Sequence, residues 1–216
     1  MLRTLTILFT FSLLLINCKK TEYEPVTTDI GQTYFPINVG QNNIFSIDSV
    51  KYNAISNTKD SVRKYIKEVI SSVEFDSSGD STYKVELYST MDTSKEWVYS
   101  SYYFFSKNKY HVNFTNGGGF ITTDLIFPVT KGVSWNINSY NLNEPQSATY
   151  SFVTKPWMEY TDCVQVFLKE DVNIVEESID KRIYSKGKGL VYRILSEVKI
   201  NSEKKNGYKI ITKRIE

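Results

Sequence analysis

Apolar and polar residues alternate along most of the chain from Tyr34 onward. The run Tyr-Lys-Val-Glu-Leu at 83–87 places its apolar residues on one face of an extended segment and its charged residues on the other. The run at 190–195 has apolar residues on both faces of an extended segment, and the run at 208–215 is likewise strand-like. These runs are rich in the branched and aromatic residues that suit a pleated sheet, so we expect β-strands.

Turn signals separate the alternating runs. Glycine occurs together with Asp, Asn, Ser or Lys at 76–80, 116–119, 186–189 and 206–207. About ten to twelve strands with short connections follow from this spacing. Because no crossover helices separate the strands, the sequence predicts a mainly β, antiparallel fold: a curved sheet, a sandwich or an incomplete barrel.

The segment 62–75 is the nearest approach to a helical pattern. Its apolar residues also suit a long strand that contains a β-bulge. A strand is the preferred interpretation, and a short helix is the alternative.

Two short motifs recur in the same order. Phe-Pro-Ile-Asn-Val-Gly at 35–40 returns as Phe-Pro-Val-Thr-Lys-Gly at 127–132, and Phe-Ser-Lys-Asn-Lys at 105–109 returns as Tyr-Ser-Lys-Gly-Lys at 184–188. The repeats are compatible with two duplicated halves, 35–126 and 127–216, and also with chance. We treat 34–216 as one β-rich domain with two candidate pseudo-repeats.

Composition narrows the class of protein. The 216 residues include 41% hydrophobic and 14% aromatic side chains, which is too apolar for a disordered chain and long enough for a real core. A net charge of +2 gives no electrostatic reason to expect nucleic acid as a partner.

The N-terminus reads as an export signal. Arg3 precedes an apolar run from Leu5 to Ile16, which is shorter than the roughly 20 residues that span a bilayer. The run ends in Leu-Ile-Asn-Cys, which resembles a bacterial lipoprotein lipobox with Cys18 as the acylated residue. We expect a signal peptide at 1–17, and a lipidated Cys18 with a polar linker at 18–33. An ordinary secretory signal with a chance cysteine is the alternative.

Together, the lipobox, the two Phe-Pro motifs and Tyr-Ser-Lys-Gly-Lys-Gly-Leu-Val-Tyr at 184–192 resemble a group of small uncharacterised Gram-negative lipoproteins. The first copy has Ile44 and Phe45 where that group usually has Trp and Tyr, so the match is partial. The resemblance implies a β-rich lipoprotein of the cell envelope, anchored at the outer membrane on its periplasmic side or on the cell surface. It implies no activity and no catalytic residues.

Few residues could support catalysis. His111 is the single histidine, and a strand histidine without a nucleophile motif is the simpler interpretation. If Cys18 is acylated, Cys163 has no disulfide partner, and its strand-like surroundings indicate a buried thiol. These two residues supply too few ligands for zinc, so we expect no metal site and no cofactor.

The aromatic content is the most unusual quantity. In the run 97–105, strict alternation would place Trp97, Tyr99, Tyr103 and Phe105 on one face, with Tyr102 and Phe104 on the other. Such a stripe can bind a glycan, peptide, lipid or protein, although aromatic stripes on sheets are more often part of the core.

These observations favour a non-enzymatic, lipid-anchored binding or scaffold module, whose partners are the membrane and an unidentified ligand. A lipocalin-like carrier of an apolar ligand is the first alternative. A carboxylate-based hydrolase is the second, and it requires two acids that face one cleft.

Overall fold

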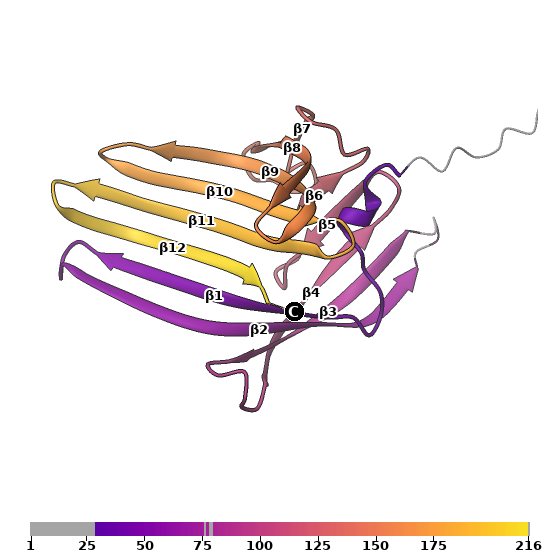
Figure 1. Cartoon of the computed structure of the whole chain (residues 1–216), viewed down its shortest axis with the longest axis horizontal. Helices are drawn as coiled ribbons and strands as arrows, with labels where there is room; N and C mark the ends of the chain where they lie inside the picture. The colour runs from indigo at the N-terminus through magenta and orange to yellow at the C-terminus, as the bar shows by residue number, and fades with distance from the viewer. Residues whose placement is uncertain (1–28, 76, 78–79, 216) are drawn as a thin grey trace, which may run out of the picture.

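The computed structural model describes residues 29–75, 77 and 80–215, and its strands form one antiparallel sheet (Figure 1). A short 3-10 turn, η1 (Gln32–Tyr34), precedes the sheet. The strands are β1 (Asn42–Asn53), β2 (Thr58–Phe75), β3 (Ser81–Thr90), β4 (Val98–Lys107), β5 (His111–Thr115), β6 (Ile121–Ile126), β7 (Ser134–Asn136), β8 (Ser147–Trp157), β9 (Tyr160–Val172), β10 (Glu176–Ser185), β11 (Gly189–Asn201) and β12 (Lys204–Arg214).

The strand order is β6-β5-β4-β3-β2-β1-β12-β11-β10-β9-β8-β7. Each half of the chain is therefore a six-strand meander, and the halves are joined where β1 pairs with β12. The sheet curls so that its edge strands, β6 and β7, approach each other and nearly close a barrel. The predicted antiparallel β fold is confirmed, and among the three expected forms it is the incomplete barrel.

Within the described residues, individual hydrogen bonds, and no regular ladder, join the two edges at this seam. The Thr123 amide donates to the Ile137 carbonyl at 2.9 Å, and the Trp135 indole donates to the Thr123 carbonyl at 2.9 Å. The Tyr150 hydroxyl donates to the Ile126 carbonyl at 2.6 Å and accepts from the Ile126 amide at 3.0 Å. The Tyr150 hydroxyl thus satisfies the two backbone groups of Ile126 that the backbone of a neighbouring strand would otherwise bind.

The main hydrophobic core fills the barrel. It takes buried side chains from both halves of the sheet, which ties the halves into one packed unit. Its members include Ile70, Val85, Tyr103, Val112, Leu125, Tyr150, Val164 and Tyr184.

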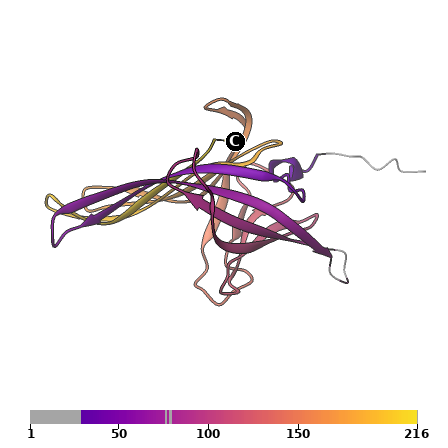
Figure 2. The same cartoon turned by 90° about the horizontal axis from the view of Figure 1, so that it is seen from below.

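Beyond the barrel, the long strands continue as a single-layer extension. Within the described chain, neither core cluster includes a residue of 46–65, 169–182 or 193–214. Figure 1 shows the hairpins β1–β2, β9–β10 and β11–β12 running together to one end of the molecule, away from the short turn η1 (indigo). Figure 2 shows this part nearly edge-on, as a thin layer.

The two Phe-Pro motifs occupy equivalent places in the two halves. The first precedes β1 and the second precedes β7. Gly40 and Gly132 both have positive φ, and each donates its amide to the following strand of its hairpin, to Ile70 and Tyr150 respectively, at 2.8 Å. The Ile70 and Tyr150 amides in turn donate to Gln41 and Val133.

The spacing between equivalent positions shows where the halves differ in length. The glycines are 92 positions apart, whereas Ile70 and Tyr150 are 80 apart. The second motif pair, at the ends of β4 and β10, is 79 apart. Nearly all of the shortening therefore lies in the first hairpin: β1–β2 is long, and its counterpart β7–β8 begins with a three-residue strand.

Two expectations about elements can now be compared with the structure. The segment 62–75 belongs to the long strand β2, whose register shifts between Ile70 and Ser72, so the bulged strand is confirmed and the helix alternative is wrong. The last residues of the expected linker at 18–33 overlap η1, and Asp29 forms an ion pair with Lys186 at 2.7 Å. The signal peptide and Cys18 lie outside the described residues.

Candidate binding surface

The outer face of β2, β3 and β4 carries an exposed cluster of rings and charges, which we call the aromatic wall. It consists of Lys67 of β2; Lys84, Glu86 and Tyr88 of β3; Trp97, which immediately precedes β4; and Tyr99, Tyr102 and Phe104 of β4.

A β-bulge at Ser100 assembles the β4 side of the wall. Leu87 pairs with Ser101, but the next residue, Tyr88, pairs with Tyr99, so β4 has one extra residue. An extra residue reverses the alternation of side chains before it. Tyr99 therefore shares the outer face with Tyr102, and the expectation that it shares a face with Tyr103 is wrong.

Tyr103 and Phe105 lie on the inner face and belong to the core. Tyr103 is 7% exposed, and its ring lies 5.0 Å from that of Phe105. The Phe105 ring also packs edge-on against Phe35, with ring centres 4.7 Å apart. The predicted stripe is thus divided: Trp97 and Tyr99 face outward, and Tyr103 and Phe105 stabilise the barrel.

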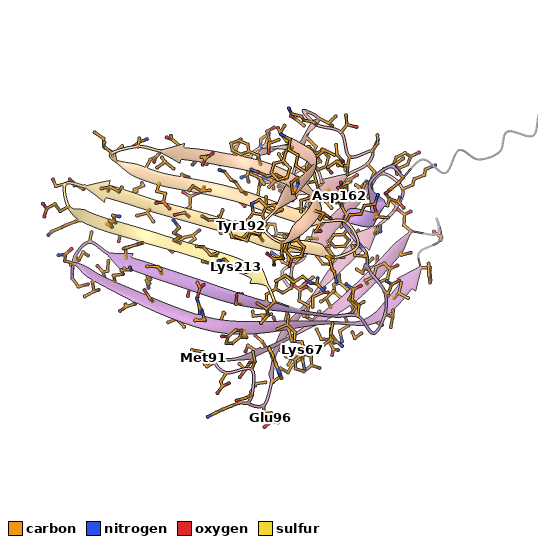
Figure 3. The ribbon with its side chains drawn as sticks, in the orientation of Figure 1. Lys67, Met91, Glu96, Asp162, Tyr192 and Lys213 are labelled. Carbon is orange, nitrogen blue, oxygen red and sulfur yellow. The ribbon has the colours of Figure 1, made fainter. Side chains whose placement is uncertain are left out.

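Lys67 is the centre of one half of the wall. Its Nζ lies 5.2 Å from the ring centre of Tyr88 and 5.1 Å from that of Trp97, which are cation–π distances. Tyr88 meets Tyr99 edge to face at 5.8 Å. Figure 3 labels Lys67 on this part of the sheet, together with Met91 and Glu96 of the β3–β4 connection.

Lys84 and Glu86 organise the other half. Their side chains form an ion pair at 2.9 Å, and Glu86 also accepts a hydrogen bond from the Tyr88 hydroxyl at 3.0 Å. The hydrogen bond from Lys84 holds the pKa of Glu86 below its usual range. Lys84 also lies 5.5 Å from the ring centre of Tyr102.

The rings of the wall remain accessible to a ligand. Tyr99 is 52% exposed and Tyr102 is 45% exposed. Sequence reasoning missed Lys67, Lys84, Glu86 and Tyr88, although the alternation in 83–87 already places Lys84 and Glu86 opposite the core residues.

The wall borders an open sheet edge. β5 pairs only with residues 104–107 of β4, and in the described chain no strand pairs with the outer edge of 98–103. A groove of about 480 Å³ beside this edge is lined by Val98, Met91 and Lys64, among others.

The barrel interior offers far less room. A cavity of about 60 Å³ is lined by Glu68, Asn43, Tyr103 and Asp124, among others. Small-molecule sites usually measure about 300–1,000 Å³, so this cavity is smaller than the site that a carrier or a hydrolase usually has.

Charged groups near this cavity bind one another. Arg182 forms an ion pair with Asp124 of β6 at 2.8 Å, and Arg193 forms one with Asp180 at 3.3 Å. Burial raises the pKa of Glu68, whose carboxylate faces Asn43 and Tyr103. The Arg182–Asp124 pair joins β10 to β6 across the barrel, which is a structural role.

His111 and Cys163, the two other residues considered from the sequence, lie outside the aromatic wall. The His111 amide donates to the Asn108 side chain, and burial lowers the pKa of its imidazole. Cys163 is a buried free thiol, as expected. Burial raises the pKa of this thiol. Among residues 29–75, 77 and 80–215, no group of three or more His, Cys, Asp or Glu side chains is placed to hold a metal ion.

Comparisons with known proteins add no family. No family model matches the chain, and neither a curated protein nor a solved structure matches it. The similarity to uncharacterised lipoproteins therefore stays a prediction. In the described part of the chain, no helix is long and apolar enough to cross a membrane.

Proposed function

We propose that the protein is a non-enzymatic binding module of the cell envelope, anchored through a lipid on Cys18, and that it binds its ligand on the aromatic wall. The observation that carries this proposal is the bulge at Ser100. Without it, Tyr99 would face the barrel interior; with it, Tyr99 joins Tyr88 and Tyr102 on an exposed surface.

Burial explains most aromatic residues in a sheet, but it does not explain these. Exposing large rings gives up the roughly 1.5–3 kcal/mol that a buried side chain of this kind contributes. Exposed aromatic residues gathered on one surface commonly mark interaction sites. The lysines above the rings add charge that can orient a ligand without preventing access to the ring edges.

The proposed anchor is compatible with access to the wall. Asp29 lies eleven positions after Cys18, and a fully extended chain over that interval reaches at most roughly 40 Å. Placement at the outer membrane is part of the proposal.

Binding to an array of soluble oligosaccharides and to an array of 12-residue peptides tests the proposal. We expect Trp97→Ala and Tyr99→Ala each to weaken binding to the selected ligand by about tenfold or more, because exposed aromatic anchors often carry much of the binding energy. Tyr140→Ala is the matched control, since Tyr140 is 54% exposed and lies outside the wall.

Equal loss of binding in the Tyr140 control would contradict the proposal. A turnover activity that depends on carboxylates and survives Trp97→Ala would also contradict it.

A further inference from the structure

The open edge of β4 has a closed counterpart within the same chain. Val112 of β5 and Val191 of β11 are 79 positions apart, the spacing found for β4 and β10, and both are buried. β5 and β11 are therefore equivalent strands. β5 ends at Thr115, whereas β11 continues to Asn201.

The additional part of β11 covers the edge of β10. Residues 195–199 pair with residues 176–180 of β10 in an unbroken antiparallel register. The positions 79 residues earlier than 176–180 are 97–101, which include the unpaired start of β4. The first half thus lacks the segment that completes the sheet in the second half.

A turn after Thr115 is the cause of the missing segment. The Asn116 side chain accepts hydrogen bonds from the amides of Gly118 at 3.0 Å and Phe120 at 3.1 Å. Gly119 has a φ of 80°, which favours glycine. These contacts reverse the chain before it can run along β4.

We infer that the edge of β4 at 98–103 binds an extended polypeptide segment of a partner protein, which pairs with β4 in the place that residues 195–199 take beside β10. This inference rests on the proposed binding function and names the class of its ligand. Strand addition satisfies the ligand backbone through main-chain hydrogen bonds, and neighbouring side chains supply specificity.

The chemistry of the edge defines the segment that it accepts. Residues 98–103 read Val-Tyr-Ser-Ser-Tyr-Tyr, without charge and without proline. Alternate side chains of an added strand would contact Tyr99 and Tyr102, because cross-strand neighbours lie about 4.5–5.5 Å apart. An uncharged segment with aromatic or branched residues at alternate positions suits this surface.

The same geometry argues against a second copy of this chain as the occupant. The bulge at Ser100 interrupts the edge between Tyr99 and Ser101. Two copies paired about a two-fold axis would bring both interruptions together, and backbone groups of both strands would stay unpaired. A partner strand without a bulge meets only one interruption.

The other exposed edge of the sheet shows the contrast. The outer side of β8 beyond Thr149 carries Lys155 and Pro156, and its register with β9 shifts repeatedly. Lysine, proline and irregular geometry are the usual protections of an edge strand. The edge of β4 carries only the bulge.

Phage display of a random 12-residue library against the full-length protein provides the probe. The most enriched peptide is synthesised, and amide hydrogen exchange of the protein is measured with and without it. We expect alternating apolar sequences among the enriched peptides, and exchange at 98–103 slowed by about tenfold or more. We also expect Ser101→Pro and Ser101→Lys to abolish binding.

The outcomes separate this inference from the proposed function. The Ser101→Lys variant keeps the inference testable if Ser101→Pro fails to fold. Binding that is lost in Trp97→Ala but persists in Ser101→Lys, with unchanged exchange at 98–103, would overturn strand addition and leave the wall as the site. Absence of any peptide enriched over the Ser101→Lys variant would also overturn it, and concentration-dependent dimerisation through 98–103 would favour a second copy instead.

Discussion

Two glutamates on opposite faces of the sheet have pKa values shifted in opposite directions. Glu68 lines the interior cavity, and burial raises its pKa above the ordinary value of 4.5. Glu86 lies on the aromatic wall, where its hydrogen bond with Lys84 lowers its pKa. The position of each glutamate in the barrel therefore sets the direction in which its pKa shifts.

These shifts predict opposite responses to pH. A raised folded-state pKa means that Glu68 opposes folding once the pH rises above its unfolded value. We therefore expect Glu68→Gln to be more stable than the natural protein at pH 7, with the difference disappearing by about pH 4. Urea unfolding at both pH values measures this.

Glu86→Gln is the matched control for that experiment. Because its folded pKa is lowered, its contribution is present at neutral pH and is lost as the pH falls through that pKa. We expect its variant to be equally or less stable at pH 7. The same pH dependence in both variants would contradict the assignment of Glu68 to the buried side.

At the scale of the strand, one residue decides which side chains reach the surface. Strict alternation in 97–105 would gather four rings on one face. The bulge at Ser100 divides them into an outer pair and an inner pair. Nothing in the local sequence marks Ser100 as the extra residue, because the neighbouring strand β3 sets the register.

Deletion of Ser100 tests this role. The deletion removes the extra residue, so strict alternation from Ser101 back to Tyr99 keeps Tyr99 opposite Tyr88 on the outer face. We therefore expect the deletion variant to keep the ligand binding that Tyr99→Ala loses. Far-UV circular dichroism checks that the sheet is retained, and a folded deletion variant that binds as weakly as Tyr99→Ala would contradict the assignment of Ser100 as the extra residue.

Sequence reasoning worked best for features that depend on local chemistry. Alternation and glycine-rich turns predicted an antiparallel sheet, and the cysteine environment predicted a buried thiol. It failed where distant strands decide the outcome. The face of Tyr99 depends on β3, and the choice between barrel and sandwich depends on side chains such as Tyr150 that meet a distant strand.

At the scale of the molecule, the two meanders close through unlike junctions. β1 and β12 share a regular ladder, whereas β6 is held to the other edge mainly by side chains. The Tyr150 hydroxyl satisfies both backbone groups of Ile126 there. Closure of the barrel therefore depends on very few polar atoms.

Tyr150→Phe tests that dependence. The substitution keeps the ring and leaves the partly buried Ile126 amide and carbonyl without the phenol, which should cost about 1–3 kcal/mol. Tyr140→Phe, at an exposed ring, should change stability by less than about 0.5 kcal/mol. Urea unfolding of both variants measures the difference, and equal stabilities would show that the seam closes without the phenol.

The single-layer extension has a consequence for how the molecule opens. In the described chain, no second layer with a hydrophobic core packs against its strands. Each pair of facing residues is therefore stabilised by the ladder hydrogen bonds and by contacts with neighbouring side chains. Local opening is easiest where few apolar contacts protect the backbone. Thermal unfolding will therefore begin at the hairpin ends and proceed along the paired strands toward the barrel. The barrel, whose interior is filled by the hydrophobic core, will unfold last.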